Sequence, residues 1–97
     1  MSETPFPELD TVIHSPARLQ IVSTLMLLEE ADFVYLLNVT NLTRGNLSTH
    51  LSKLEEVGYV EIEKTYRNKR PLTLLRLTKQ GRNAYEIYRK TLLDFLK

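Results

Sequence analysis

Small polar and basic side chains follow one another between residues 43 and 53, and they are the groups in this chain best suited to hydrogen-bonding chemistry. They are Thr43, Arg44, Asn46, Ser48, Thr49, His50 and Lys53. Arginine can pair with guanine, and asparagine with adenine, through two hydrogen bonds each, and hydroxyl groups can bind phosphates or base edges. These residue types therefore match the donors and acceptors of a nucleic-acid groove.

A second cluster of cations follows about twenty residues later, in the sequence YRNKRP between two apolar alternating segments. Arg67, Asn68, Lys69 and Arg70 would form the tip of a hairpin there. Such a tip could neutralise phosphates or place one arginine in a minor groove. The alternative is a charged turn that only keeps the protein soluble.

The segment that carries the first cluster is predicted to be a helix. Leu47, Leu51 and Leu54 recur at i, i+4 and i+7 and define a buried stripe, which leaves the polar residues on the opposite side. Serine, threonine, asparagine and glycine form helices less readily than the Glu, Lys and Gln of an ordinary solvated face. We therefore expect this face to make contacts, although a merely exposed face remains the alternative.

The elements that would position both clusters can be placed from capping residues and hydrophobic spacing. Ser15 before Pro16 begins a helix that runs to about Glu29, and Asp32 caps a short helix over 33–40. Asn41 allows a left-handed turn, Thr43 caps the helix over 44–57, and Gly58 ends it. Strands follow around Val60 and Leu75, and Thr78 caps a helix over 79–97.

This order predicts an α+β, mostly helical fold with three helices, a two-stranded hairpin and a C-terminal helix. The 97 residues suffice for one domain, with an arm over about 1–14 before the first helix. We expect the C-terminal helix to contribute to dimerisation.

The charge is distributed unevenly along the chain. The net charge is only +1, yet residues 1–63 carry three basic and ten acidic side chains, whereas residues 64–97 carry ten basic and two acidic ones. From Lys64 to Tyr85 there are seven cations and no acid. A local positive field can therefore exist on a nearly neutral protein.

Composition excludes several classes of function. The chain has no cysteine, so disulfides, thiolate catalysis and cysteine-ligated metals are excluded. No apolar run approaches the ~20 residues of a membrane span, and the N-terminus lacks the pattern of a signal peptide, so we expect a cytoplasmic protein. A Gly-x-Ser-x-Gly elbow, a phosphate loop and a zinc-protease motif are all absent, which argues against an enzyme.

Three segments resemble the winged helix-turn-helix transcriptional regulators of the MarR/ArsR type, in particular the small single-domain members. They are VIHSPARLQIVSTL, LTRGNLSTHLSKLEEVGYVEIEKT and LRLTKQGR, and the likeness covers roughly residues 9–89. The middle segment is the most specific, because it combines a helix stripe, a glycine stop and a strand start. Many relatives have glycine where this chain has Asn41, and metal-sensing members use cysteines, or histidines with carboxylates, where this chain offers only His14 and His50.

The resemblance implies a sequence-specific regulator of transcription that binds double-stranded DNA. Helix 44–57 would enter the major groove of a palindromic operator, and the wing, residues 66–71, would lie on the backbone or in the minor groove. In such regulators a histidine at the position of His50 orients the helix or touches the backbone, and boundary packing is the alternative. We expect no metal and no cofactor, and the sequence identifies no effector site.

Excess apolar surface on the first and last helices predicts a homodimer, since one small domain can hardly cover it. The other explanation is that all of this surface is core within one chain. The candidates for the dimer interface are Leu9, Ile13, Ile21, Leu25, Leu28, Tyr88, Leu92, Phe95 and Leu96.

A second function from a different class is a winged-helix module that binds another protein and no DNA. Glu55, Glu56, Glu61 and Glu63 crowd the end of the third helix and the first strand. These carboxylates would repel phosphate if they faced it.

Overall fold

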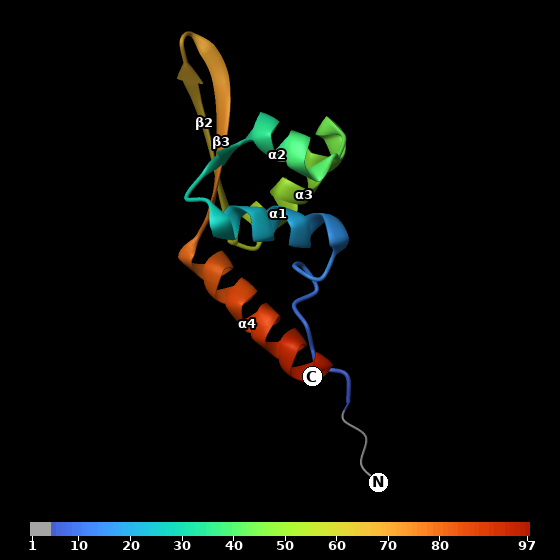
Figure 1. The fold of residues 1–97 in the computed structure, drawn as a ribbon. Helices are drawn as coiled ribbons and strands as arrows, with labels where there is room; N and C mark the ends of the chain where they lie inside the picture. The colour runs from blue at the N-terminus through green and yellow to red at the C-terminus, as the bar shows by residue number, and fades with distance from the viewer. Residues whose placement is uncertain (1–4) are drawn as a thin grey trace.

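The computed structural model describes residues 5–97 and shows four helices and three strands (Figure 1). The elements in order are α1 (Pro16–Leu27), β1 (Ala31–Asp32), α2 (Phe33–Thr40), α3 (Arg44–Glu56), β2 (Val60–Arg67), β3 (Arg70–Leu77) and α4 (Lys79–Leu96). The predicted α+β, mostly helical winged-helix arrangement is confirmed. Residues 1–4 of the predicted arm lie outside the described residues.

The sheet contains one strand that the sequence did not predict. Its order is β1-β3-β2 and all pairs are antiparallel, with Ala31 opposite Leu75 and Asp32 opposite Leu74. The first helix was predicted to reach Glu29, but it ends at Leu27 and Leu28 is already extended. The chain has to leave the helix there because residues 31 and 32 pair with β3.

Side-chain caps begin all four helices, as predicted. The oxygen atoms of Ser15, Asp32, Thr43 and Thr78 accept from backbone N–H groups three residues ahead, at 3.4, 2.7, 3.1 and 2.9 Å. The Thr78 hydroxyl also donates to the carbonyl of Gly58 at 2.5 Å. The start of α4 is therefore tied to the end of α3.

Two left-handed residues set the angles at which α3 begins and ends, and both predictions are confirmed. Asn41 has φ 58° and its N–H donates to the carbonyl of Leu37. Gly58 has φ 84°, and the N–H of Tyr59 donates to the carbonyl of Leu54 at 2.9 Å, which closes the C-terminal turn of α3. The strand β2 follows directly.

The core lies between α1, the other two N-terminal helices and the inner face of the sheet. Its central residues are Ile21, Val22, Leu25, Leu36, Leu47, Leu51, Leu54, Val60 and Leu75. Three predicted dimer residues, Ile13, Ile21 and Leu25, are fully buried within the single chain, and Tyr88 is 5% exposed. The chain's own packing already covers the apolar surface of these four interface candidates, so they offer little surface to a second subunit.

The helix α4 extends from the base of the hairpin beside α1, and the N-terminal segment runs toward its end (Figure 1). His14 Nδ1 lies 2.8 Å from the Tyr88 hydroxyl, and the rings of Phe6 and Phe95 meet edge to face at 4.8 Å. Among the described residues no helix is both long and apolar enough to cross a membrane.

Candidate nucleic-acid interface

The outward face of α3 presents most of the first polar cluster at the surface of the protein. Its exposed residues are Thr43, Arg44, Asn46, Ser48, Thr49 and Lys53. Two hydroxyls are partly engaged, since Thr43 caps the helix and Thr49 donates to the carbonyl of Gly45 at 3.0 Å. The leucine stripe on the other side is buried, so the face is held rigidly by the core.

A groove of about 360 Å³ separates this face from the hairpin. Its lining residues are Phe33, Arg44, Ser48, Leu51, Ser52, Ile62, Lys64 and Thr73. Two cations and three hydroxyls surround an apolar floor, and no carboxylate is among them. A groove with this composition favours an anion, such as a backbone phosphate.

Lys64 and Thr73 are residues that the sequence-based site missed. They are directly paired across β2 and β3, and they follow Ile62 and Leu75 on the face turned toward α3. The alternation of Val60 and Ile62 was the available signal, because side chains two residues apart share a face of a strand. It places Lys64 beside the polar face of α3.

Arg44 is held in this groove by an aromatic ring. Its guanidinium lies 5.7 Å from the centre of the Phe33 ring, within the range of a cation–π contact. Phe33 is the first residue of α2. Helices α2 and α3 therefore present the arginine jointly.

His50 lies on the opposite flank of α3 from Arg44 and is half-buried. Its Nδ1 is 3.1 Å from Nη1 of Arg18, a residue of α1. The sequence placed His50 at the edge of the leucine stripe, but it gave no indication of this partner 32 positions away.

The tip of the wing has an unusual backbone. Asn68 and Lys69 both have positive φ, 52° and 64°, which is the conformation of a two-residue type I′ turn. Asparagine tolerates it, whereas lysine has no local reason to be there. The turn therefore places an exposed cation at the tip of the hairpin.

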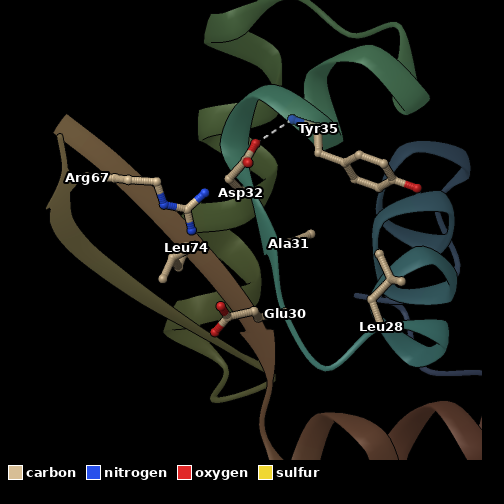
Figure 2. A pocket seen from close by; sticks show the side chains of 7 residues that line it. All are labelled: Leu28, Glu30, Ala31, Asp32, Tyr35, Arg67 and Leu74. Carbon is tan, nitrogen blue, oxygen red and sulfur yellow. Dashed lines mark hydrogen bonds between the residues drawn. The ribbon is translucent and has the colours of Figure 1, made fainter. Parts of the chain in front are cut away.

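Arg67 and Arg70 are paired directly across the strands and lie on the face turned away from α3. Figure 2 shows Arg67 directed from the wing toward Asp32, above a hollow of about 310 Å³ that Glu30 and Leu74 also line. The predicted wing cations are therefore not all on one side. Lys69 occupies the tip, and Arg67 and Arg70 occupy the outer face beside it.

Two of the four carboxylates that weighed against nucleic acid lie away from the groove, whereas Glu55 and Glu56 are exposed in the last turn of α3, where a carboxylate oxygen of Glu56 lies 3.9 Å from Nζ of Lys53. Glu61 and Glu63 are on the outer face of the sheet, where Arg76 pairs with both and with Glu30. The hydrogen bond to Glu63 raises the pKa of Arg76 above its ordinary value, so the arginine stays charged. Because Glu61 and Glu63 alternate with Ile62, they point away from the α3 side.

Comparison with known proteins assigns the chain to a family. A model of the family described as "Winged helix DNA-binding domain" matches residues 17–96. The uncharacterized protein MJ0432 of Methanocaldococcus jannaschii is 40% identical over 86 residues, which are 89% of this chain and 94% of that protein.

Solved structures share the fold. A transcriptional regulator homologue from Pyrococcus horikoshii OT3 is 29% identical with a TM-score of 0.84, over 89% of this chain and 85% of that chain. A mutant MarR from E. coli, complexed with operator DNA, is 21% identical with a TM-score of 0.66, over 84% of this chain and 69% of that chain. These likenesses confirm the predicted winged-helix fold, which the MarR structure shares.

Proposed function

The chain belongs to the winged helix DNA-binding domain family, and from this premise we propose that it is a sequence-specific transcriptional regulator that binds double-stranded DNA as a homodimer. The observation that carries the proposal is the groove between α3 and the hairpin. Cations and hydroxyls from α3, β2 and β3 converge there around an apolar floor, and no acid is among the lining residues.

In the proposed complex α3 enters the major groove and the wing lies along the backbone or in the minor groove. Arg44 and Asn46 are the base-reading candidates, because each can form two hydrogen bonds to one base. Ser48, Thr49 and Lys53 extend the contact along the helix. Lys64 and Thr73 bind the phosphate strand between α3 and the wing, and Lys69 and Arg70 bind phosphates beyond it.

The proposed homodimer uses the apolar side chains that the single chain leaves uncovered. Leu9, Leu28, Leu92 and Phe95 are half-buried, and Leu96 is 65% exposed. Ile87 and Leu93 on α4 are 59% and 46% exposed. Two recognition helices related by a twofold axis would read half-sites about one helical turn apart, so we expect a palindromic operator.

Two measurements test the proposal. A gel shift with a mixed-sequence 30-base-pair duplex at low salt should show binding, with a log-log salt slope of about −0.9 per neutralised phosphate. Failure to bind any duplex at low salt would favour the protein-interaction module instead. Sedimentation at micromolar concentration should give twice the chain mass of 11.3 kDa, and a clean monomer would exclude the dimer.

A further inference from the structure

The contact between Arg18 and His50 links three parts of the chain. Arg18 Nη1 lies 3.1 Å from His50 Nδ1 on α3, and Arg18 Nε donates to the carbonyl of Val12 in the arm at 2.5 Å. A guanidinium can donate hydrogen bonds but cannot accept them. His50 Nδ1 is therefore the acceptor, and the neutral ring carries its proton on Nε2.

The second ring nitrogen of His50, Nε2, is available to donate a hydrogen bond to a ligand. Within residues 5–97, no hydrogen bond is made by His50 Nε2, and no buried side-chain nitrogen or oxygen lacks a partner. Since His50 is a half-buried residue, its unpartnered Nε2 has to be accessible to solvent. The imidazole of His50 is thus held by Arg18 at Nδ1, and its Nε2–H group is accessible to a ligand.

This donor lies on the flank of α3 that faces away from the wing. At 100° per residue, Arg44 and Ser48 share the flank that borders the wing groove, whereas Asn46, His50 and Lys53 share the other. Asn46 and Lys53 are both exposed. A helix in a major groove has a phosphate strand on each side, and the groove lined by Lys64 and Thr73 accounts for only one of them.

We propose that Arg18 positions His50 as a neutral Nε2–H donor that binds a DNA backbone phosphate on the side of α3 away from the wing. The inference rests on the proposed function. Arg18 acts through the imidazole and does not itself touch the phosphate. The carbonyl of Val12 accepts a hydrogen bond from the same guanidinium and holds it in place. Residues of α1 and of the arm together therefore set the orientation of His50 on α3.

The tautomer of His50 in the free protein tests the positioning role. Long-range proton–nitrogen NMR spectra of the wild type should show His50 protonated at Nε2 and unprotonated at Nδ1. Arg18→Met keeps the aliphatic stem and removes the donor, so it should give a mixture of tautomers. Arg89→Met is the matched control, because Arg89 is exposed on α4. An unchanged tautomer in Arg18→Met would overturn the positioning role.

Affinity for a mixed-sequence 30-base-pair duplex tests the phosphate contact. His50→Ala should weaken binding about three- to tenfold, the loss expected for one hydrogen bond. His50→Gln should recover much of this loss, because its amide N–H can replace Nε2–H. Arg18→Met should weaken binding as much as His50→Ala, and the double variant no further. Equal binding by His50→Ala and wild type would refute the contact.

The salt dependence separates this mechanism from a direct phosphate contact by Arg18. A neutral imidazole releases no counterion, so the log-log slope should stay the same in Arg18→Met. If Arg18 itself bound a phosphate, the magnitude of the slope would fall by about 0.9, and the inference would be wrong. If the folded wild type bound no duplex, the proposed function and the phosphate contact would both fail, whereas the NMR result would still decide the positioning role.

Discussion

The guanidinium of Arg44 in the first turn of α3 lies over the ring of Phe33 at the start of α2, 5.7 Å from the ring centre. A cation in the first turn opposes the helix dipole. The contact with Phe33 offsets that cost by about 0.5 to 1 kcal/mol at an exposed site. Because the side chain is held above the groove before DNA arrives, little conformational entropy is lost when it binds.

Replacement of Arg44 and Arg70 should have different consequences for DNA binding. Arg44→Ala should relax sequence preference by about 1 to 3 kcal/mol at one base pair, since it removes a bidentate base contact. Arg70→Ala should weaken binding evenly, because it removes a phosphate contact. Affinities for a duplex selected from a random pool and for a mixed-sequence duplex measure the difference. Parallel losses on both duplexes in the two variants would contradict this division.

Gly45 should be tested because nothing in the chain requires a glycine there. A side chain added at Gly45 would meet no atom within 4 Å, and glycine weakens a helix relative to alanine. Gly45→Ala should therefore stabilise the fold by about 0.4 to 1 kcal/mol. It should also weaken DNA binding by about 1 to 3 kcal/mol, because the added methyl group would crowd the groove.

The control for Gly45→Ala is Asn83→Ala, at an exposed position of α4. It also improves helix propensity, but it should leave DNA affinity unchanged. Urea denaturation and duplex titration give the two quantities for each variant. DNA binding that is unchanged or tighter in Gly45→Ala would show that the backbone of α3 does not approach the bases closely.

The wing turn should show a conflict between stability and DNA binding at Lys69. Its φ of 64° is a conformation that costs a non-glycine residue about 1 to 2 kcal/mol. Lys69→Gly should therefore stabilise the hairpin by about 1 kcal/mol, while the salt slope of DNA binding falls by about 0.9 in magnitude. Lys69→Ala removes the same charge but keeps a non-glycine residue in the unfavourable left-handed backbone conformation. It should match the DNA defect without the gain in stability, and a smaller DNA defect in Lys69→Gly would argue against a charge contact.

The parts of the fold that the sequence predicted are governed by neighbours a few residues apart. Caps at Ser15, Asp32, Thr43 and Thr78 act over three residues, and Gly58 ends α3 through bonds within one turn. Strand β1 was missed because two residues have no periodicity, and the strand exists only through its pairing with Leu74 and Leu75. The first helix was predicted to extend beyond Leu27 because this strand pairing, which ends the helix early, was not foreseen.

The candidate site shows the same limit. The polar face of α3 followed from helical spacing, but the partner of His50 is brought to it by tertiary packing of α1. Lys64 could have been included from strand alternation alone. Four of the nine dimer candidates are buried within the single chain, because apolar spacing predicts that a side chain is buried but not which surface covers it. Ile21 and Leu25 proved to be core, whereas Leu96 is exposed.

Tyr59 connects the N-terminal segment to the junction of α3 and β2, and its ionisation should make stability depend on pH. Its hydroxyl donates to a carboxylate oxygen of Asp10, whose other oxygen accepts from the N–H groups of Val12 and Ile13 at 2.8 and 3.1 Å. The hydrogen bond to Asp10, burial and the negative charge of that carboxylate together raise the pKa of Tyr59 to about 12. The folded state thus favours the neutral phenol.

Since the folded pKa lies above the unfolded value of about 10, the contribution of Tyr59 to stability is complete below pH 10. It is lost as the pH rises toward 12. The free energy of unfolding should therefore fall more steeply between these values in the wild type than in Tyr59→Phe, which should be less stable near neutral pH by about 0.5 to 1.5 kcal/mol. Tyr66→Phe, at a side chain 73% exposed on the wing, should follow the wild-type profile. Parallel profiles for wild type and Tyr59→Phe would show that the Asp10 contact does not hold the arm in solution.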